Sequence, residues 1–274
     1  MTCSVSSPAV VRLALNTLGI SGTLPTRLGL LSQLNYLDLA TNSLGGTIIT
    51  ELASLSQLTA LGLGDNAFSG SVPTQLGLMS QLMGLYLYQN KLTGSLPTHV
   101  GSMAQLKDLY INFNSLSGAL PTQLGSLSQL SELLLQGNSL GGTIITELAS
   151  LSRLTKLELG DNAFSGSLPT QLGLMSQLIG LYIYQNALSG SVPTHLGSMA
   201  QLKYLWVHFN SLSGALPTQL GALSQLYDLD LGSNALFGSL PTELGRLASM
   251  NLFAVVRSYA PIYQRSLLSP YMRL

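Results

Sequence analysis

Leucines and polar residues alternate along this chain in a unit of 24 residues that repeats ten times without a gap. Each unit runs close to L-x-x-L-x-L-x-x-N-x-L-x-G-x-L-P-T-x-L-G-x-L-S-Q, with its first residue counted here as position 1. The units begin at Val10, Leu34, Leu58, Leu82, Leu106, Leu130, Leu154, Leu178, Leu202 and Leu226. Gap-free self-similarity at this period is typical of a solenoid, in which each unit packs on its two neighbours.

The pattern predicts one short strand and one short helical turn in each unit. The segment L-x-x-L-x-L alternates apolar and variable residues, so we expect a strand with its leucines inward and its variable residues outward. Stacked in parallel, these strands form one concave sheet. The Gly at position 13 predicts a backbone with positive φ. The Thr at position 17, followed by x-Leu-Gly, predicts the N-cap of a short helical or 3₁₀ turn on the convex side.

A polar residue recurs where the chain turns away from each strand. A side-chain amide supplies both a donor and an acceptor, so a buried ladder of Asn is expected to satisfy the backbone there. Only the first unit departs, with Leu18 at this position. The ladder consists of Asn42, Asn66, Asn90, Asn114, Asn138, Asn162, Asn186, Asn210 and Asn234.

The segment L-x-G-x-L-P-x-x-L-G-x-L resembles the plant-specific class of leucine-rich repeats, and the resemblance covers Val10 to Ser249. It implies an α/β leucine-rich-repeat solenoid, a horseshoe or superhelix, with a parallel sheet on the concave face and short 3₁₀ or helical turns on the convex face. In that family, receptor ectodomains and secreted proteins hold ligands on the concave or lateral face. The resemblance therefore implies a non-enzymatic recognition module.

Three segments make up the expected domain organisation. Residues 1–9 include Thr2-Cys3-Ser4, which resembles the end of the family's amino-terminal cap, and the upstream half of that cap is expected to be missing. This favours an extracellular or secreted protein, although no signal peptide is present in the chain; a cytoplasmic protein with an incidental thiol is the alternative. Residues 10–249 form the ten-repeat solenoid. Residues 250–274, where an eleventh strand begins, are expected to cap the solenoid or to dock a structural subunit onto a larger assembly.

Composition excludes several classes of function. Charged residues are 8% of the chain, against ~25% in ordinary soluble domains. Because the formal net charge is zero, binding to nucleic acid has no electrostatic support. The sequence contains no run of 18 apolar residues of the kind that would indicate a membrane span. His99 and His195 stand 96 residues apart, and no catalytic, metal-binding or cofactor-binding constellation is recognisable.

A longer duplication lies over the short period. Residues 34–129 and 130–225 align without a gap and are identical at 76 of 96 positions. The variable strand positions supply 20 of these sites, and 11 of the 20 differ. The concave face has therefore diverged faster than the rest, as a recognition surface does.

Aromatic residues concentrate at the variable strand positions. Exposed Tyr and Trp offer large rigid contact areas with a polar tip, which is typical of binding hot spots. Stabilisation of neighbouring strands by stacked rings is the alternative interpretation. A protein, peptide or glycan would suit such a mildly acidic face, with two lysines beside the rings. The candidate residues form a first cluster of Tyr86, Tyr88, Tyr110, Phe113 and Lys107, and a second cluster of Tyr182, Tyr184, Tyr204, Trp206, Phe209 and Lys203.

Threonine forms a second regular feature. Position 17 is Thr in every unit, and position 14 is Thr, Ser or Ala. Such rows of small side chains on a charge-poor flank resemble the surfaces of ice-binding proteins, so ice binding is a rival function. The alternative is that each Thr caps its helical turn through a backbone hydrogen bond. The row at position 17 consists of Thr26, Thr50, Thr74, Thr98, Thr122, Thr146, Thr170, Thr194, Thr218 and Thr242.

Overall fold

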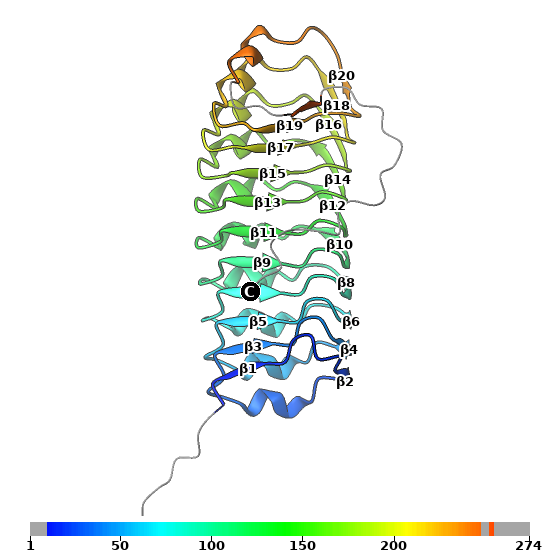
Figure 1. The fold of residues 1–274 in the computed structure, drawn as a ribbon, viewed down its shortest axis with the longest axis vertical. Coiled ribbons are helices and arrows are strands. Elements are labelled where there is room, and N and C mark those ends of the chain that lie inside the picture. The colour runs from blue at the N-terminus through cyan, green and yellow to red at the C-terminus, as the bar shows by residue number, and fades with distance from the viewer. Residues whose placement is uncertain (1–9, 248–251, 255–274) are drawn as a thin grey trace, which may run out of the picture.

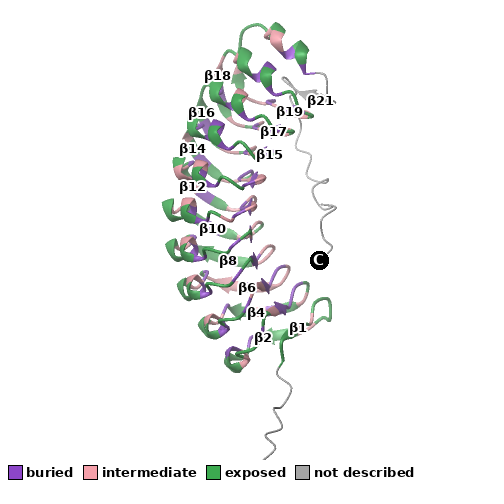
Figure 2. Ribbon diagram, turned by 90° about the vertical axis from the view of Figure 1, so that its left-hand side faces the viewer, coloured by how far each residue is buried: buried purple, intermediate pink, exposed green. Residues whose placement is uncertain are grey.

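The computed structural model describes residues 10–247 and the backbone of 252–254. The chain winds through stacked coils, each of which contributes one strand to an 11-stranded sheet, one strand to a 10-stranded sheet and one 3₁₀ helix (Figure 1). The stack curves, with the 11-stranded sheet on its inner side and the helices on its outer side (Figure 2). This is the parallel solenoid that the repeat predicts.

The concave sheet is built from three-residue strands at positions 3 to 5 of successive units. Every pair is parallel, and partner residues lie 24 apart, as in Leu37↔Leu61. The strands are β1 (Arg12–Ala14), β3 (Tyr36–Asp38), β5 (Ala60–Gly62), β7 (Gly84–Tyr86), β9 (Asp108–Tyr110), β11 (Glu132–Leu134), β13 (Lys156–Glu158), β15 (Gly180–Tyr182), β17 (Tyr204–Trp206), β19 (Asp228–Asp230) and β21 (Leu252–Ala254). The last of these confirms the expected eleventh strand.

A second parallel sheet lies on the flank, where the sequence had suggested only turns. Its partner residues lie 22 apart, as in Thr47↔Ser69, so the strands shift by two residues in each unit relative to the repeat. The strands are β2 (Ser21–Thr23), β4 (Ser43–Thr47), β6 (Ala67–Gly70), β8 (Lys91–Gly94), β10 (Ser115–Ala119), β12 (Ser139–Thr143), β14 (Ala163–Ser167), β16 (Ala187–Gly190), β18 (Ser211–Gly214) and β20 (Ala235–Leu236).

Short 3₁₀ helices complete each coil on the convex side. Each is five residues long, and no α-helix occurs in the described part of the chain. The helices are η1 (Thr26–Leu30), η2 (Thr50–Ser54), η3 (Thr74–Leu78), η4 (Thr98–Ser102), η5 (Thr122–Ser126), η6 (Thr146–Ser150), η7 (Thr170–Leu174), η8 (Thr194–Ser198), η9 (Thr218–Ala222) and η10 (Thr242–Arg246).

The interior between the sheets and helices is filled by the repeated apolar positions. Leu61, Leu85 and Leu157, at the centre of their strands, have no exposed surface. Full burial of a Leu side chain stabilises the fold by about 1.5–3 kcal/mol relative to leaving it exposed. At the amino-terminal end, Leu13 and Leu15 are only half-buried, as expected for the first described coil.

The Asn ladder is confirmed, with half-buried side chains, and its bonds between units all run to the preceding unit. Asn66 donates from Nδ2 to the carbonyls of Leu39, Leu63 and Gly64, and its Oδ1 accepts the N–H of Leu44. Leu39 and Leu44 belong to the preceding unit. Each Asn therefore closes the turn of its own coil and completes the backbone hydrogen bonding of the coil before it.

The backbone at position 13 is left-handed in all ten units, with φ of +74° at Gly46, which confirms the expected use of glycine. Because glycine has no side chain, it adopts a positive φ here without the steric cost that other residues would meet.

The expected capping role of the threonines is wrong. The N-cap residue of each 3₁₀ helix is the preceding Pro or Ile in extended conformation, and no side-chain cap bond forms. In η1 the carbonyl of Pro25 accepts the N–H of Leu28, which leaves the Thr26 hydroxyl outside the turn. All ten threonines are exposed.

Two predictions lie outside the described residues. These are the cap-like segment 1–9, with Cys3, and the role of the tail 250–274 as a cap or docking segment, of which the structure describes only the backbone of 252–254.

Candidate ligand-binding face

The second aromatic cluster forms a continuous layer of rings on the concave sheet. Tyr182 of β15 stacks on Tyr204 of β17 at 6.3 Å between ring centroids and meets Trp206 edge-on at 5.0 Å. Tyr184 stacks on His208 at 5.1 Å with an interplanar angle of 4°, and Trp206 lies 6.3 Å from His208. Geometries of this kind add about 0.5–1.5 kcal/mol per pair beyond area burial. The structure therefore brings the sequence-predicted residues together.

Two members of this layer were not predicted from the sequence. Tyr227 meets Tyr204 edge-on at 6.0 Å, and His208 lies between Tyr184 and Phe209. Both stand at variable strand positions of adjacent units, and this placement in the repeat could have identified them from the sequence as members of the layer.

The first cluster is less continuous. Tyr86 and Tyr110 meet edge-on at 5.1 Å. Tyr88 instead lies across Gly64 of the preceding unit, where an added Cβ would come within 2.5 Å of its ring. Phe113 lies across Gly137 of the following unit in the same way. The sequence-predicted first cluster is thus one ring pair and two separate rings.

Phe113 and Phe209 also depart from the expected strand position. Both have positive φ, 55° and 52°, at the turn that follows the strand. Such a backbone is uncommon for a bulky residue. Their side chains stay about 40% exposed, at the edge of the concave face. Lys107 and Lys203 are exposed as well, one residue before β9 and β17.

Carboxylates of the next strand hold the tyrosine tips in the first cluster. The Tyr86 hydroxyl donates to Asp108 at 3.1 Å, and the Tyr110 hydroxyl donates to Glu132 at 2.6 Å. Burial, followed by the neighbouring carboxylates, raises the pKa of both tyrosines. Burial also raises the pKa of Asp108, an effect partly opposed by the Tyr86 hydroxyl. These rings are therefore fixed in place as neutral donors.

The second cluster holds a histidine among acids. His208 Nδ1 lies 3.3 Å from an Asp230 oxygen. Burial lowers the pKa of His208 more than Asp230 and Asp228 raise it. Burial, with Glu158 and Asp161, raises the pKa of Tyr184 to about 12. At neutral pH the layer is thus uncharged on its rings and acidic beneath them.

Several polar atoms of this face are buried without a hydrogen bond of good geometry. They are Gln136 Oε1, Trp206 Nε1, His208 Nδ1 and Asp228 Oδ1. The Trp206 indole N–H faces Asp228 closely enough to lower the pKa of that carboxyl, although burial raises it more. Together with the 3.3 Å approach of His208 to Asp230, this pairs the buried polar atoms of Trp206, His208 and Asp228 with one another or with Asp230, in contacts of imperfect geometry.

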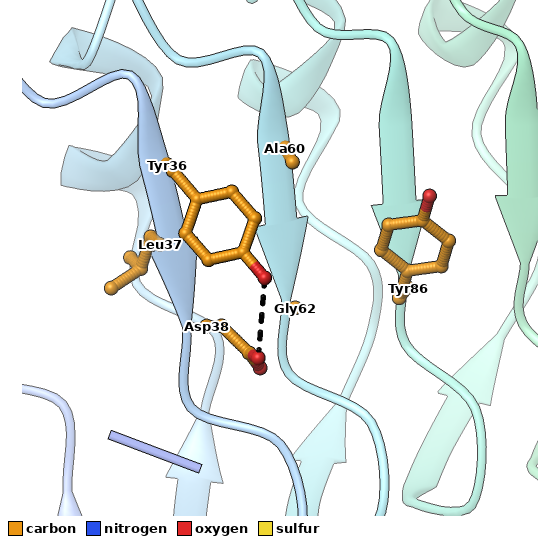
Figure 3. Close-up of a pocket in the computed structure, with 6 residues that line it drawn as sticks. All are labelled: Tyr36, Leu37, Asp38, Ala60, Gly62 and Tyr86. Atoms are coloured by element: carbon orange, nitrogen blue, oxygen red, sulfur yellow. Dashed lines mark hydrogen bonds between the residues drawn. The ribbon is translucent and has the colours of Figure 1, made fainter. Parts of the chain in front are cut away.

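A small notch lies in the concave face beside the first cluster (Figure 3). Tyr36 of β3 and Tyr86 of β7 stand on either side of β5, whose outward residues are Ala60 and Gly62. The Tyr36 ring reaches over towards β5, and its hydroxyl donates to Asp38 at 3.4 Å (Figure 3). Because Ala60 and Gly62 are small, the space between the two tyrosines stays open.

The equivalent place in the second copy is filled. Lys156 and Glu158 of β13 stand where the first copy has Ala60 and Gly62, and they form an ion pair of 2.6 Å. Leu134 stands in place of Asp38. The duplicated block therefore carries one open and one closed version of the same surface.

The flank sheet presents a different surface, made of small residues. Positions 10, 12 and 14 of the described units hold mainly Ser, Thr, Ala and Gly, with Lys91 as the one charged residue among them. The candidate Thr row at position 17 borders this sheet. Because partner residues shift by two per unit, Thr47 stands beside Ser69 rather than Ser71. The hydroxyl rows therefore cross the flank obliquely.

The described residues contain no group of three or more His, Cys, Asp or Glu side chains that would hold a metal ion. Over the same part of the chain, no helix is long and apolar enough to cross a membrane.

Stacked 24-residue coils with a leucine interior, an Asn ladder and a concave parallel sheet define a leucine-rich-repeat solenoid. The Leucine Rich Repeat family matches residues 33–55 and 105–127. No curated protein matches the chain. Solved structures of plant repeat proteins match it along most of its length, as given below. The chain is a leucine-rich-repeat protein of the plant type.

Two of the similar structures are plant receptors. The LRR ectodomain of the membrane receptor kinase GASSHO1/SCHENGEN3 from Arabidopsis thaliana, in complex with CASPARIAN STRIP INTEGRITY FACTOR 2, is 36% identical with a TM-score of 0.87. The match covers 88% of this chain and 29% of that one. The plant peptide hormone receptor RGFR1, in complex with RGF2, is 33% identical with a TM-score of 0.86 over 90% of this chain and 39% of its own. The chain thus spans well under half of these receptor chains.

A third similar structure is a plant ice-binding protein. It is 27% identical with a TM-score of 0.70, and the match covers 81% of this chain and 71% of that protein. The two groups of relatives therefore share one scaffold and carry different named functions.

Proposed function

We propose that this protein is a non-enzymatic recognition module that binds an extended stretch of protein or peptide on its concave face, outside the cell. The centre of the binding surface is the ring layer on β15, β17 and β19. The first cluster extends it across the preceding strands.

The observation that carries this proposal is the continuous layer of aromatic rings that the concave sheet brings together. An aromatic surface bordered by carboxylates and by Lys203 suits a peptide, which offers apolar side chains, charges and a polar backbone. The faster divergence of concave positions between the two copies also supports the concave face as the binding surface.

The relatives support the proposal at a coarser level. The receptors named above are ectodomains or hormone receptors solved with peptide hormones or factors bound. Because this chain spans only 29% and 39% of them, neither their ligands nor their signalling partners are carried over.

Selection from a displayed library of random peptides tests the proposal. The selected peptides should lose at least 100-fold in affinity when Tyr182 and Trp206 are both changed to Ala, because hot-spot rings each contribute about 2 kcal/mol or more. Thr170→Ala with Thr194→Ala, on the flank, is the matched control and should leave affinity unchanged. Peptides that bind the ring variant as well as the native protein would contradict the proposal. So would binding of glycans alone on an array.

Ice binding is the second candidate, and it is favoured by the flank. The threonines at position 17 are exposed and make no cap bond. Helix capping therefore does not explain why every unit has Thr at this position. They border a ten-stranded sheet whose strands repeat at about 4.8 Å and whose outward residues are small. The plant ice-binding protein matches over 71% of its own length.

Thermal hysteresis measures this candidate directly. Changing Thr98, Thr122 and Thr146 to Lys puts bulk and charge into the middle of the row, and it should abolish hysteresis while peptide binding persists. The Tyr182→Ala with Trp206→Ala variant serves as the converse control. Absence of hysteresis in the native protein removes this candidate.

A further inference from the structure

We propose that the notch between Tyr36 and Tyr86 is a subsite for a basic side chain, a lysine or an arginine, of the bound polypeptide. The inference rests on the proposed function, since it names one contact that a ligand on the concave face makes.

The walls of the notch are two fixed aromatic rings. The Arg12 guanidinium lies 3.6 Å from the centroid of the Tyr36 ring, and the Tyr36 hydroxyl is held by Asp38. Tyr86 is held by its bond to Asp108. A cation within about 6 Å of a ring face is attracted by the ring quadrupole, most strongly when water is excluded. Rigid rings on either side therefore favour a cation between them.

The floor of the notch is a buried carboxylate. Asp38 is 6% exposed and is the single buried polar or charged residue among those described. It accepts the N–H of Ala40 at 3.0 Å and the hydroxyl of Tyr36, and neither ion pair in the described residues includes it. A carboxylate offers about four acceptor sites, so acceptor capacity remains for a ligand. A buried charge is costly unless it is paired, and an entering ammonium or guanidinium supplies the pair.

The opening of the notch depends on Gly62. A Cβ added there would lie 2.8 Å from Asp38 Oδ1. The site is small, lined by Leu37 and Ala60 besides the residues already named, so it fits the end of one side chain rather than a segment of backbone.

The second copy of the block indicates which side chain suits this place. There the chain itself supplies Lys156 in place of Ala60. The Lys156 ammonium lies 2.6 Å from Glu158 and 5.9 Å from the ring centroid of Tyr182, the counterpart of Tyr86. A lysine ammonium between a carboxylate and a tyrosine ring is thus an arrangement that the same scaffold already holds. The first copy has the equivalent ring, Tyr86, and a carboxylate from a different position, Asp38, but Ala60 stands where the second copy has the lysine.

The experiment uses short blocked peptides as probes and the full chain as receptor. Acetyl-Gly-Gly-Lys-Gly-Gly-amide and its norleucine, arginine and glutamate counterparts are titrated into the protein with labelled tyrosines. The Lys and Arg peptides should shift the ring signals of Tyr36 and Tyr86 saturably, with at least tenfold higher affinity than the norleucine peptide. The Glu peptide should not bind.

Two variants separate the subsite from folding. Ala60→Lys places the second copy's lysine in the notch at an outward position, and it should abolish the shifts. Asp38→Asn should weaken Lys binding at least tenfold and leave norleucine unchanged. Lys156→Ala, in the filled counterpart, is the matched control and should have no effect at Tyr36.

Equal affinity for the Lys and norleucine peptides would overturn the inference, as would full binding by the Ala60→Lys variant. Selected long peptides that lack basic residues and ignore Ala60→Lys would overturn the subsite while leaving the proposed function standing. Conversely, saturable Lys binding at the notch without any selectable long peptide would keep the subsite and remove the proposed function.

Discussion

The two copies of the four-unit block, residues 34–129 and 130–225, have closely similar interiors and different concave surfaces. Positions of the buried core differ only by exchanges among Leu, Ile and Val, such as Leu87 in the first copy and Ile183 in the second. In the first copy, Ala60 and Gly62 leave a notch over a buried Asp38. In the second, Lys156 and Glu158 close that place with an ion pair, and the rings beyond them form a continuous layer. Positions of the buried core have therefore changed only among aliphatic residues of similar size, whereas concave positions have changed in size, charge and aromatic character.

The largest expected effect tests the shared interior. Leu61→Ala in the first copy and Leu157→Ala in the second remove fully buried side chains from equivalent strands. Each should lower the free energy of unfolding by about 3 kcal/mol, within the 2–5 kcal/mol typical of such changes. Urea denaturation followed by circular dichroism measures both. If the two losses in free energy of unfolding differ by much more than about 1 kcal/mol, the interiors of the copies are not equivalent.

The next effect separates the two aromatic clusters. Trp206→Ala removes a ring in contact with Tyr182, Tyr184 and His208, whereas Tyr110→Ala removes one that contacts Tyr86. For a peptide selected on the native protein, we expect about a 100-fold loss of affinity for Trp206→Ala and about tenfold for Tyr110→Ala. Calorimetric titration gives both values. A larger loss at Tyr110 would move the centre of binding to the first copy.

A smaller effect comes from opening the second copy. Lys156→Ala combined with Glu158→Gly installs the residues of the first copy and removes the ion pair. Both side chains are partly exposed, at 29% and 15%, so the pair is worth at most about 1 kcal/mol. The free energy of unfolding should change by less than this amount. A greater loss would mean that the ion pair holds the second copy together.

The smallest effect concerns pH and His208, whose counterpart in the first copy is Asn112. The folded pKa of His208 is lowered by burial, so the unfolded chain takes up the proton first as pH falls below about 6.5. The stability contributed by neutral His208 is therefore present above that pH and lost as pH falls through the folded pKa.

His208→Asn makes the two copies alike at this position and should flatten the fall in unfolding midpoint between pH 7.5 and 5.5. The groups facing His208 are Asp230, Asp228 and Tyr184, and they are present in both proteins. An equally steep fall in the variant would assign the pH dependence to the acids instead.

Much of the fold follows from the sequence because the repeat fixes each local requirement ten times. The glycine at position 13 and the Asn at position 9 have the roles that their chemistry predicts. The flank sheet was missed because segments such as Ser43–Thr47 contain Gly and Ser, which are poor strand formers. Stacking of adjacent coils supplies the pairing that propensity does not.

The candidate site was less predictable, since it depends on how neighbouring units combine. Tyr88 and Tyr184 lie across equivalent glycines, Gly64 and Gly160, but only Tyr184 has an aromatic partner, His208, in the next unit, where the first copy has Asn112. The notch arises from two small residues between two tyrosines on different strands. The threonines were expected to cap helices, but Pro25 and its counterparts occupy that place in a turn too short to use them.

The direction of the Asn ladder has a consequence for how the chain folds during synthesis. Asn42 bonds the carbonyl of Leu15 and the N–H groups of Leu18 and Ile20, all in the unit before its own. A coil emerging from the ribosome therefore keeps unpaired backbone groups until the next Asn follows it. Since chains fold from the amino terminus as they are made, ordered structure should advance about one unit behind the exit site. A stalled or shortened chain then leaves one incomplete coil, always the last, however many units precede it.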